Sequence, residues 1–275
     1  MDLTGFDSWI GNKERSLDDI PLTLVKRMAA TFGVPCPSVD GPLPHLWHWA
    51  FFQEPVFEED IGVDGHPKLG TFLPPLKGRI RMWAGGRIKF FAPLLVGREA
   101  ERYSDVVNVV EKEGQSGSLV FVTVRHRYSQ DEILCIEEEQ DIVYRYPSAP
   151  AKSSKDSQKK FDWASQINPS TVMLFRYSAV TFNGHRIHYD YPYVTGKEGY
   201  QNLVVHGPLI ATLLLSDFLK NNPDKDPERF EFRGIRPLTQ GEPFQLGGRL
   251  ETNNSFELCA FNENGPAHNA KVFCK

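Results

Sequence analysis

Cysteine is scarce in this sequence, and its spacing argues against two common kinds of site. The 275 residues contain 4 cysteines, which lie far apart and form no Cys-x-x-Cys pair. A disulfide framework or a zinc ribbon is therefore not expected, whereas a reducing, cytoplasmic compartment is. No histidine motif accompanies any of them, so we interpret them as small apolar residues and not as catalytic thiols. The cysteines are Cys36, Cys135, Cys259 and Cys274.

The sequence also lacks a basic excess and a long apolar segment. Its 31 Lys and Arg residues are outnumbered by 35 Asp and Glu residues, which gives a formal net charge of −4. A nucleic-acid-binding domain normally has a basic excess, so no nucleic-acid partner is expected. The first 16 residues contain no basic segment followed by an apolar one, and no later run is long enough to cross a bilayer. We expect neither a secretory signal nor a membrane partner.

One segment has the composition of a linker. Residues 147–160 combine proline, serine and lysine with almost no large apolar side chain. Such a segment buries too little surface to offset the entropy lost on ordering, so we expect it to be exposed. It predicts an N-terminal domain at residues 1–146, a linker at 147–168 and a C-terminal domain at 169–275, with both domains in the usual size range.

The N-terminal portion is predicted to begin with an amphipathic helix and to continue with strands. Apolar residues recur at helical spacing over residues 16–32, and Gly33 follows as a stop signal. Downstream, β-branched and aromatic residues partly alternate with polar ones, and glycines separate several of the runs. Long strands with few helices between them favour an antiparallel sheet. The predicted strands are 79–82, 86–91, 99–113, 119–128 and 133–146.

The C-terminal portion is predicted to contain one long apolar helix among strands. A strand is expected at residues 172–181, then a loop rich in histidine and tyrosine, then a helix at 207–220 that Pro223 ends. A buried helix among antiparallel strands indicates an α+β fold in which a sheet wraps around the helix, the hotdog arrangement, and the first half could be a degenerate copy of it. The remaining predicted strands are 229–236, 243–253, 256–262 and 271–274.

Polar and ionisable residues are densest at residues 182–190, just before the helix start at 204–211. Two histidines, an arginine, an asparagine and an aspartate fall within the first of these segments. Histidine is the side chain best suited to proton transfer near neutral pH. The pair Gly207-Pro208 begins the helix, where free N–H groups and the positive end of the helix dipole could hold a thioester oxygen that becomes negative. The pattern favours acid–base chemistry on an acyl thioester.

At these residues the sequence resembles the MaoC-like, R-specific enoyl-thioester hydratases. The likeness covers residues 175–190, 199–200 and 203–208, and it extends into the first half through 46–52 and 81–87. It is closest to the branch with mesaconyl-C4-CoA hydratase, itaconyl-CoA hydratase and type 2 hydroxyacyl-thioester dehydratase. The resemblance implies two hotdog domains, a homodimer, an acyl-CoA substrate and no cofactor. It also implies that the second domain supplies the catalytic loop and the first helps to form the acyl pocket.

The resemblance assigns roles within the catalytic loop. The family motif is Gly-Asp-x-Asn-Pro-aliphatic-His, in which the aspartate and the histidine form the catalytic pair. His188 matches that histidine, Asn183 stands at the aspartate position, His185 at the asparagine position and Arg186 at the proline position. The glycine whose N–H would form the oxyanion hole matches Gly207.

The change from aspartate to asparagine in this motif alters the expected chemistry. An amide can orient water but cannot act as a carboxylate base. Our hypothesis is that His188 is the main general acid and base and that Asn183 positions the water or the β-hydroxyl. Asp190 is a candidate for the missing carboxylate, and His185 for a second acid–base group.

Arginines in and near the loop suggest how a substrate is held. Arg186 beside the catalytic histidine could pair with a substrate carboxylate, which favours an itaconyl or mesaconyl-C4 group hydrated to citramalyl-CoA; Arg176 could do the same. Tyr177 is a further candidate for the substrate site. Arg233 and Arg236 are candidates for contact with the phosphates of CoA.

Other interpretations remain open. A single histidine is more often a packing residue than a catalyst, and His206 is expected to support the helix start. His185 and His188 are three residues apart, but no cysteine or glutamate set accompanies them, so no metal site is expected. The protein could instead dehydrate 3-hydroxyacyl chains on an acyl carrier protein, or bind acyl-CoA without catalysis. No function is assigned to His45, His48, His66, His126 and His268.

Overall fold

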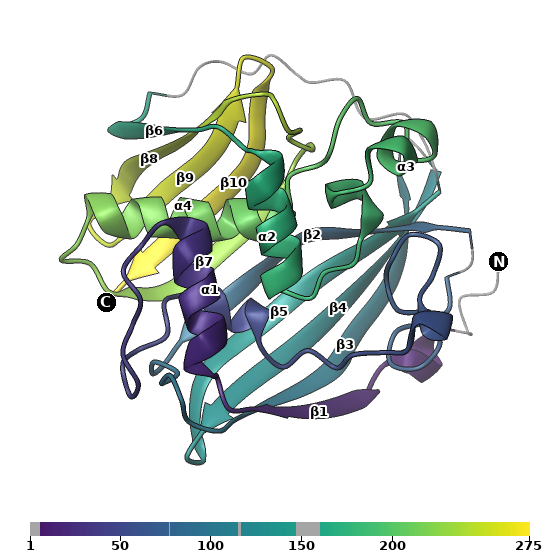
Figure 1. The fold of residues 1–275 in the computed structure, drawn as a ribbon, viewed down its shortest axis with the longest axis horizontal. Coiled ribbons are helices and arrows are strands. Elements are labelled where there is room, and N and C mark those ends of the chain that lie inside the picture. Colours follow the sequence, from purple (N-terminus) through teal and green to yellow (C-terminus); the bar gives the residue numbers. More distant parts are fainter. Residues whose placement is uncertain (1–5, 77, 115–116, 147–159) are drawn as a thin grey trace.

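A single antiparallel sheet of ten strands organises the molecule (Figure 1). The computed structural model describes residues 6–76, 78–114, 117–146 and 160–275. The strand order is β1-β3-β4-β5-β2-β7-β10-β9-β8-β6, so the first five strands come from the N-terminal half and the last five from the C-terminal half. The strands are β1 (Lys13–Asp18), β2 (Ile80–Phe90), β3 (Ala100–Gly114), β4 (Gly117–Gln130), β5 (Ile133–Arg145), β6 (Trp163–Ile167), β7 (Pro227–Gly234), β8 (Phe244–Thr252), β9 (Ser255–Asn262) and β10 (Gly265–Cys274).

The two half-sheets join where β2 pairs with β7. Residues from Gly85 to Lys89 of β2 lie opposite residues from Arg233 back to Arg229 of β7. The two strands predicted at 79–82 and 86–91 are one strand, β2, with a register shift between Trp83 and Gly85. A glycine is needed at this shift, because a Cβ on Gly85 would lie 2.4 Å from the carbonyl oxygen of Phe232. The predicted break is therefore a bulge in a continuous strand.

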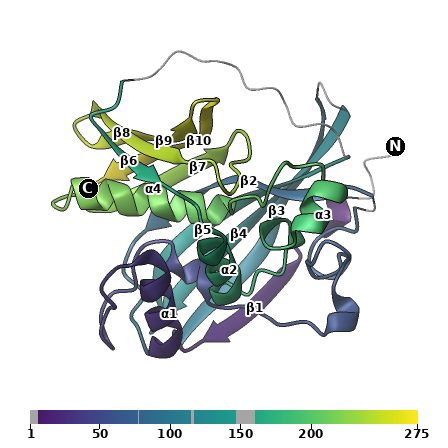
Figure 2. The same cartoon turned by 45° about the horizontal axis from the view of Figure 1, so that its top comes forward.

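The long helix of the C-terminal half lies against its sheet, as predicted (Figure 2). Helix α4 (Gly207–Asn221) contacts β8, β9 and β10 and buries side chains around much of its surface. Burial on several sides is typical of a helix enclosed by other elements and not of a surface helix. Pro208 occupies the first turn, where its missing N–H has no intrahelical partner to lose. This placement matches a sheet that wraps around a helix.

The single helix predicted at residues 16–32 is instead the end of a strand followed by a shorter helix. Strand β1 extends from Lys13 to Asp18, and helix α1 (Leu22–Phe32) begins only after Pro21. The proline explains the later start, because its fixed φ suits a helix boundary and its ring disfavours a preceding helical residue. The predicted end is confirmed, since Gly33 adopts φ 67° at the C-terminus of α1.

The strand predicted at residues 172–181 is wrong, because this segment forms helix α2 (Thr171–Val180). Ser170 caps the helix, and its hydroxyl accepts a hydrogen bond of 3.1 Å from the N–H of Met173. The β-branched residues at the ends of the segment had favoured a strand. The buried side chains Leu174, Tyr177 and Ser178 instead follow helical spacing.

The remaining predictions concern boundaries. Residues 147–159 of the predicted linker lie outside the described residues, whereas Trp163–Ile167 form strand β6, which pairs with β8. The last part of the segment predicted as a linker therefore contains a strand of the C-terminal half-sheet. Strand β10 begins at Gly265, before the predicted 271, and the other strands agree closely. Among the described residues no helix combines the length and apolarity needed to cross a membrane.

Candidate active site

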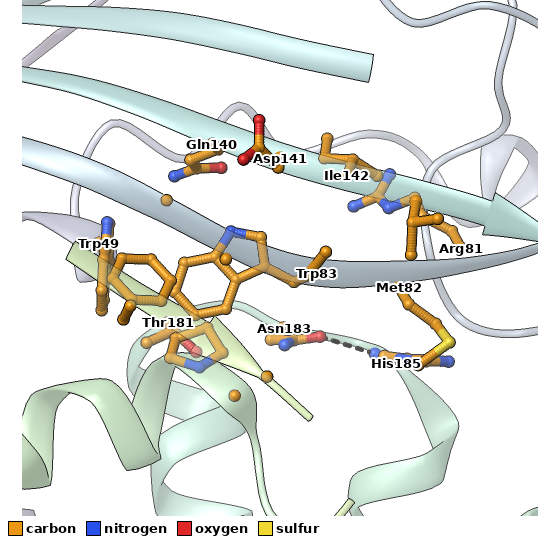
Figure 3. Close-up of a pocket in the computed structure, with 18 of the residues that line it drawn as sticks. Trp49, Arg81, Met82, Trp83, Gln140, Asp141, Ile142, Thr181, Asn183 and His185 are labelled. Carbon is orange, nitrogen blue, oxygen red and sulfur yellow. Dashed lines mark hydrogen bonds between the residues drawn. The ribbon is translucent and has the colours of Figure 1, made fainter. Parts of the chain in front are cut away.

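The catalytic loop, which contains the polar residues 182–190, lies between α2 and α4. It faces strands of the N-terminal half across a large cavity. The loop contains a short helical turn (Arg186–His188) and helix α3 (Tyr191–Gly196). The cavity has a volume of about 2140 Å³ and is lined by residues of both halves. Figure 3 shows Trp83 of β2 opposite Asn183 and His185 of the loop. The site therefore requires both halves of the chain.

His188 lies buried on the wall of this cavity with its tautomer fixed. Its Nδ1 is 2.8 Å from the carbonyl oxygen of Val204. Because a carbonyl only accepts, Nδ1 must carry the proton and Nε2 is left unprotonated as a base. Burial lowers the pKa of His188 to about 4. The imidazole is thus neutral at physiological pH, and its one basic nitrogen is set by the backbone.

His206 supports His188 from behind. The two rings stack with centroids 3.6 Å apart, and Nε2 of His206 is 2.8 Å from the hydroxyl of Ser178 on α2. Burial lowers the pKa of His206 well below its ordinary value. His206 also lies at the N-cap of α4. These contacts support the structural role expected for this residue.

The start of α4 forms another part of the cavity wall. Gly207 lines the cavity, and its N–H, in the first turn, has no acceptor within the helix. His206 at the N-cap makes no side-chain hydrogen bond to the helix end. A Cβ on Gly207 would lie 3.1 Å from the ring of Trp83, so the wall is closely packed here. Its N–H and the helix dipole can stabilise a negative oxygen in the cavity.

Asn183 lines the cavity but also shapes its own loop. Its side-chain oxygen accepts a hydrogen bond of 3.0 Å from the backbone N–H of His185 (Figure 3). This is an Asx-type turn, which leaves the amide nitrogen as the group able to contact water or a substrate oxygen. Asn183 is therefore placed to position such a group.

Arg186 and Asp190 lie outside the cavity, which corrects two expectations. The carboxylate of Asp190 accepts hydrogen bonds of 2.9 and 2.7 Å from Arg186, and its other oxygen caps α3 at the N–H of Tyr193. The guanidinium of Arg186 also stacks on the ring of Tyr193 and donates to the carbonyl oxygen of Val63. Asp190 is thus not placed to act as the missing carboxylate. Arg186 is engaged in holding the loop and not in binding a substrate carboxylate.

The other predicted binding residues fall into two groups. Arg176 is exposed on α2 and does not line the cavity. Tyr177, buried on the same helix, does line it, and so do Arg233 and Arg236. The guanidinium of Arg236 donates to the carbonyl oxygens of Gly265 and Pro237, whereas Arg233 is exposed and makes no hydrogen bond or ion pair within the described residues.

Sequence reasoning missed three residues that face the catalytic loop from the N-terminal half. Arg81 of β2 lines the cavity and makes no ion pair within the part of the chain that is described. Nδ1 of His66 lies 2.9 Å from the carboxylate of Asp64, and the His66 ring lies 4.2 Å from that of His185. Arg81 belongs to a matched block, but no pattern marked the other two. Asp64, His66 and His185 also bring ligand atoms within 4.8 Å of one another, so within the described residues the spacing suited to a metal lies here.

Comparisons with known proteins agree with this architecture. The family model for hydroxyacyl-thioester dehydratase type 2 matches residues 46–240. A mesaconyl-C(4)-CoA hydratase of Chloroflexus aurantiacus is 44% identical over 247 residues, which cover 88% of each chain. The mitochondrial hydroxyacyl-thioester dehydratase type 2 of Schizosaccharomyces pombe is 28% identical over 262 residues, which cover 84% of this chain and 87% of the relative.

Solved structures share the fold at low sequence identity. A MaoC-like dehydratase superposes with a TM-score of 0.70 at 13% identity, over 98% of this chain and 99% of the other. A Mycobacterium tuberculosis protein described as a double hotdog superposes with a TM-score of 0.59 at 11% identity, over 96% of both chains. The predicted double-hotdog fold and the resemblance to MaoC-like proteins are confirmed. This chain belongs to the hydroxyacyl-thioester dehydratase type 2 family.

Proposed function

We propose that this protein catalyses the reversible addition of water to the double bond of an acyl-CoA thioester. One observation carries the proposal: two groups belong to the walls of one cavity, the unprotonated Nε2 of buried His188 and the start of α4 at Gly207, whose N–H has no acceptor within the helix. A base and an oxyanion site on the same cavity are what this reaction needs. The membership of the chain in a family of dehydratases supports the same reaction.

The chemistry follows from these positions. Nε2 of His188 removes a proton from water while the water oxygen bonds to Cβ, and the π electrons move to the thioester oxygen near the N–H of Gly207. The enolate then takes the proton back from His188 at Cα, which restores the carbonyl and the neutral imidazole. Asn183 orients the water in this scheme, and the reverse sequence dehydrates the hydroxyacyl thioester.

The acyl group we propose is a dicarboxylic monothioester, mesaconyl-C4-CoA or itaconyl-CoA, hydrated to citramalyl-CoA. The relative that is 44% identical has mesaconyl-C(4)-CoA hydratase as its name. Arg81 takes the place of Arg186 as the partner of the distal carboxylate, because its guanidinium lines the cavity and is not neutralised by a carboxylate of the described residues. Arg233 remains our candidate for the phosphates of CoA; it lies opposite Gly85, where β7 pairs with β2.

A panel of thioesters tests the substrate. Hydration of mesaconyl-C4-CoA, itaconyl-CoA and crotonyl-CoA is followed by the loss of enoyl-thioester absorbance in wild type and in Arg81→Gln. We expect the carboxylated substrates to be preferred and their kcat/KM to fall about 10- to 100-fold in the variant, the effect of losing a charge-assisted hydrogen bond. Crotonyl-CoA should change little. A wild-type preference for crotonyl-CoA would contradict the dicarboxylate assignment.

The reaction itself is tested at His188. His188→Gln should lower kcat by at least about 100-fold, since general acid–base catalysis contributes about 10²–10⁴. His45→Gln is the matched control, because His45 packs on Phe90 and does not line the cavity. Equal activity in the two variants would refute the role of His188. No hydration of any thioester by wild type would favour the binding protein without catalysis.

One alternative has its own support. The family match and the 28% identical relative are both named as type 2 hydroxyacyl-thioester dehydratases. Adding 3-hydroxyacyl thioesters of CoA and of acyl carrier protein to the panel would distinguish this activity by the carrier and chain that react fastest. The homodimer, the cytoplasmic location and the domain boundaries at 146 and 169 stay predictions.

A further inference from the structure

The histidine cluster of this site, His66, His185, His188 and His206, extends across both halves of the chain. Successive ring centroids lie 4.2, 5.4 and 3.6 Å apart, from His66 through His185 and His188 to His206. Three of the four rings line the cavity, and His206 lies behind them. A proton taken from water by this cluster creates a positive charge in a buried place, where an uncompensated charge is costly.

No described carboxylate of the loop between α2 and α4 is hydrogen-bonded to this cluster. Glu198 of that loop lines the cavity but accepts a hydrogen bond of 3.1 Å from the hydroxyl of Tyr193. Nδ1 of His188 donates to a backbone carbonyl, Asn183 is an amide, and Asp190 is paired with Arg186 outside the cavity. Among the described residues, Asp64 is the carboxylate hydrogen-bonded to a member of the cluster. Its Oδ2 is 2.9 Å from Nδ1 of His66, and its Oδ1 accepts the backbone N–H of His66 at 3.1 Å.

The loop that carries Asp64 and His66 is docked on the catalytic loop by backbone contacts. The N–H of Arg186 donates to the carbonyl oxygen of Asp64 at 2.8 Å. Gly65 and Gly184 meet so closely that a Cβ on Gly65 would lie 1.9 Å from the carbonyl oxygen of Gly184. The position of His66 beside His185 is therefore fixed by the fold and is not a chance contact of a surface loop.

We propose that Asp64 and His66 are the carboxylate–imidazole pair that stabilises the imidazolium formed in this site during water addition. They act through His185 on His188 and so are positioning residues. This inference rests on the proposed function and adds to it a carboxylate that is hydrogen-bonded to the histidine cluster. The proton still moves from water to His188 and back to Cα, so the balance of the reaction is unchanged.

Electrostatics at the pair agree with this role. Burial and the nearby charge of Arg81 lower the pKa of His66, while the Asp64 carboxylate acts to raise the pKa of both His66 and His185. Burial opposes ionisation of Asp64, yet the hydrogen bonds and charge of His66 hold the pKa of Asp64 well below its ordinary value. Asp64 is thus ionised at neutral pH. The charged and titratable groups that interact with this pair from other elements are Arg81, Tyr144, His185, His188, Tyr193 and Glu198.

A metal ion is the other chemistry that these side chains could support, but the geometry favours a hydrogen-bonded carboxylate–imidazole pair. Asp64 and His66 are at hydrogen-bond distance. The rings of His66 and His185 face one another with an interplanar angle of 40°, whereas ligands of a small metal converge on one point with their nitrogens. The metal content of the purified protein, measured by mass spectrometry, distinguishes the two cases.

Asp64→Asn tests the proposal, with Asp60→Asn as the matched control. Asparagine keeps one oxygen that can accept an N–H of His66, but it removes the charge and replaces the second acceptor with an NH2 donor. Asp60 is an exposed acid of the same segment that does not line the cavity. We expect Asp64→Asn to lower kcat about 10- to 100-fold with little change in KM. The acid limb of the pH–rate profile should move to lower pH, because imidazoles lacking a nearby carboxylate bind protons less tightly.

Three outcomes decide the matter. Asp64→Glu should recover part of kcat and of the pH profile, which a purely structural loss would not show. If kcat and the acid limb of Asp64→Asn match those of Asp60→Asn while His188→Gln is inactive, the inference fails and the proposed function stands. If wild type contains one equivalent of a metal that Asp64→Asn lacks, the pair is a metal site and the inference is likewise overturned.

Discussion

The contact between Gly65 and Gly184 offers a sharp test of how the two halves form one site. Gly65 adopts φ +91° and touches Gly184, whereas Gly11 adopts φ +90° with nothing within 4 Å of an added Cβ. Gly65→Ala and Gly11→Ala therefore incur the same backbone strain, about 1 kcal/mol. Only Gly65→Ala also adds a steric clash, so comparing the two variants separates the effect of backbone strain from the effect of displacing the loop.

The size of the displacement follows from the contact. An added Cβ would lie 1.9 Å from the oxygen of Gly184, while ordinary contacts begin at 3.4 Å, so the loops must separate by about 1.5 Å. That movement weakens two hydrogen bonds from Arg186 to the carbonyl oxygens of Asp64 and Val63. At about 1 kcal/mol each, their loss makes the docked loop about 2 kcal/mol less stable.

Activity should respond more strongly than stability. A misplacement of about 1 Å in a catalytic site can lower the rate about 100-fold. We expect kcat for thioester hydration to fall by that order in Gly65→Ala and to stay within about twofold of wild type in Gly11→Ala. Urea unfolding followed by circular dichroism should show that both variants remain folded. Equal kcat in the two variants would refute the claim that this loop contact positions the site.

Two further predictions concern stability. Glu138 is fully buried and accepts hydrogen bonds from Trp49 and Gln140, both at 2.9 Å. Glu138→Leu should therefore lower the free energy of unfolding, measured with urea at pH 7.5, by about 3 kcal/mol or more. A loss below about 1 kcal/mol would contradict this. Four buried or half-buried histidines have pKa values lowered to about 4, so between pH 6.5 and 4 the unfolded chain binds more protons and stability must fall as pH falls. Each contributes about 1.4 kcal/mol per pH unit, which places acid unfolding above pH 4; a urea midpoint that is unchanged from pH 7.5 to 5.5 would contradict this. The four histidines are His45, His126, His188 and His268.

The fold could largely be predicted because its strands and its central helix have strong local patterns. In β4, buried and half-buried residues alternate along most of the strand, which matches the alternation seen in the sequence. Helix α4 is bounded by Gly207-Pro208 and by Pro223, both readable signals. The prediction for helix α2 was wrong because its β-branched residues were given more weight than the cap at Ser170. Over ten residues, propensity is a weak guide to secondary structure, since packing can override it.

The sequence could group candidate site residues only where they are close along the chain. His188, Asn183 and Gly207, taken from the loop and the helix start, do line one cavity. The sequence could not show which arginine faces the cavity, because Arg186 contacts Asp190 and Tyr193 on its own side of the loop. An arginine with a carboxylate four residues away on a helical segment commonly forms such a pair, so the sequence did contain a reason to doubt its role in substrate binding.

The loop's own polar residues explain why the chemistry has to be shared between the halves. Asn183 hydrogen-bonds to the backbone of its own turn, and Arg186 and Asp190 pair with each other, so much of their bonding capacity holds the loop in shape. What remains on the loop is imidazole and the carboxylate of Glu198, which accepts from the hydroxyl of Tyr193. An imidazole with a lowered pKa is a weak base without a neighbouring negative charge. Asp64 is the nearby hydrogen-bonded carboxylate, and it lies more than a hundred residues earlier in the chain. A contact between two glycines fixes its place, and since glycines contribute no side-chain pattern, reading the loop alone could not have revealed it.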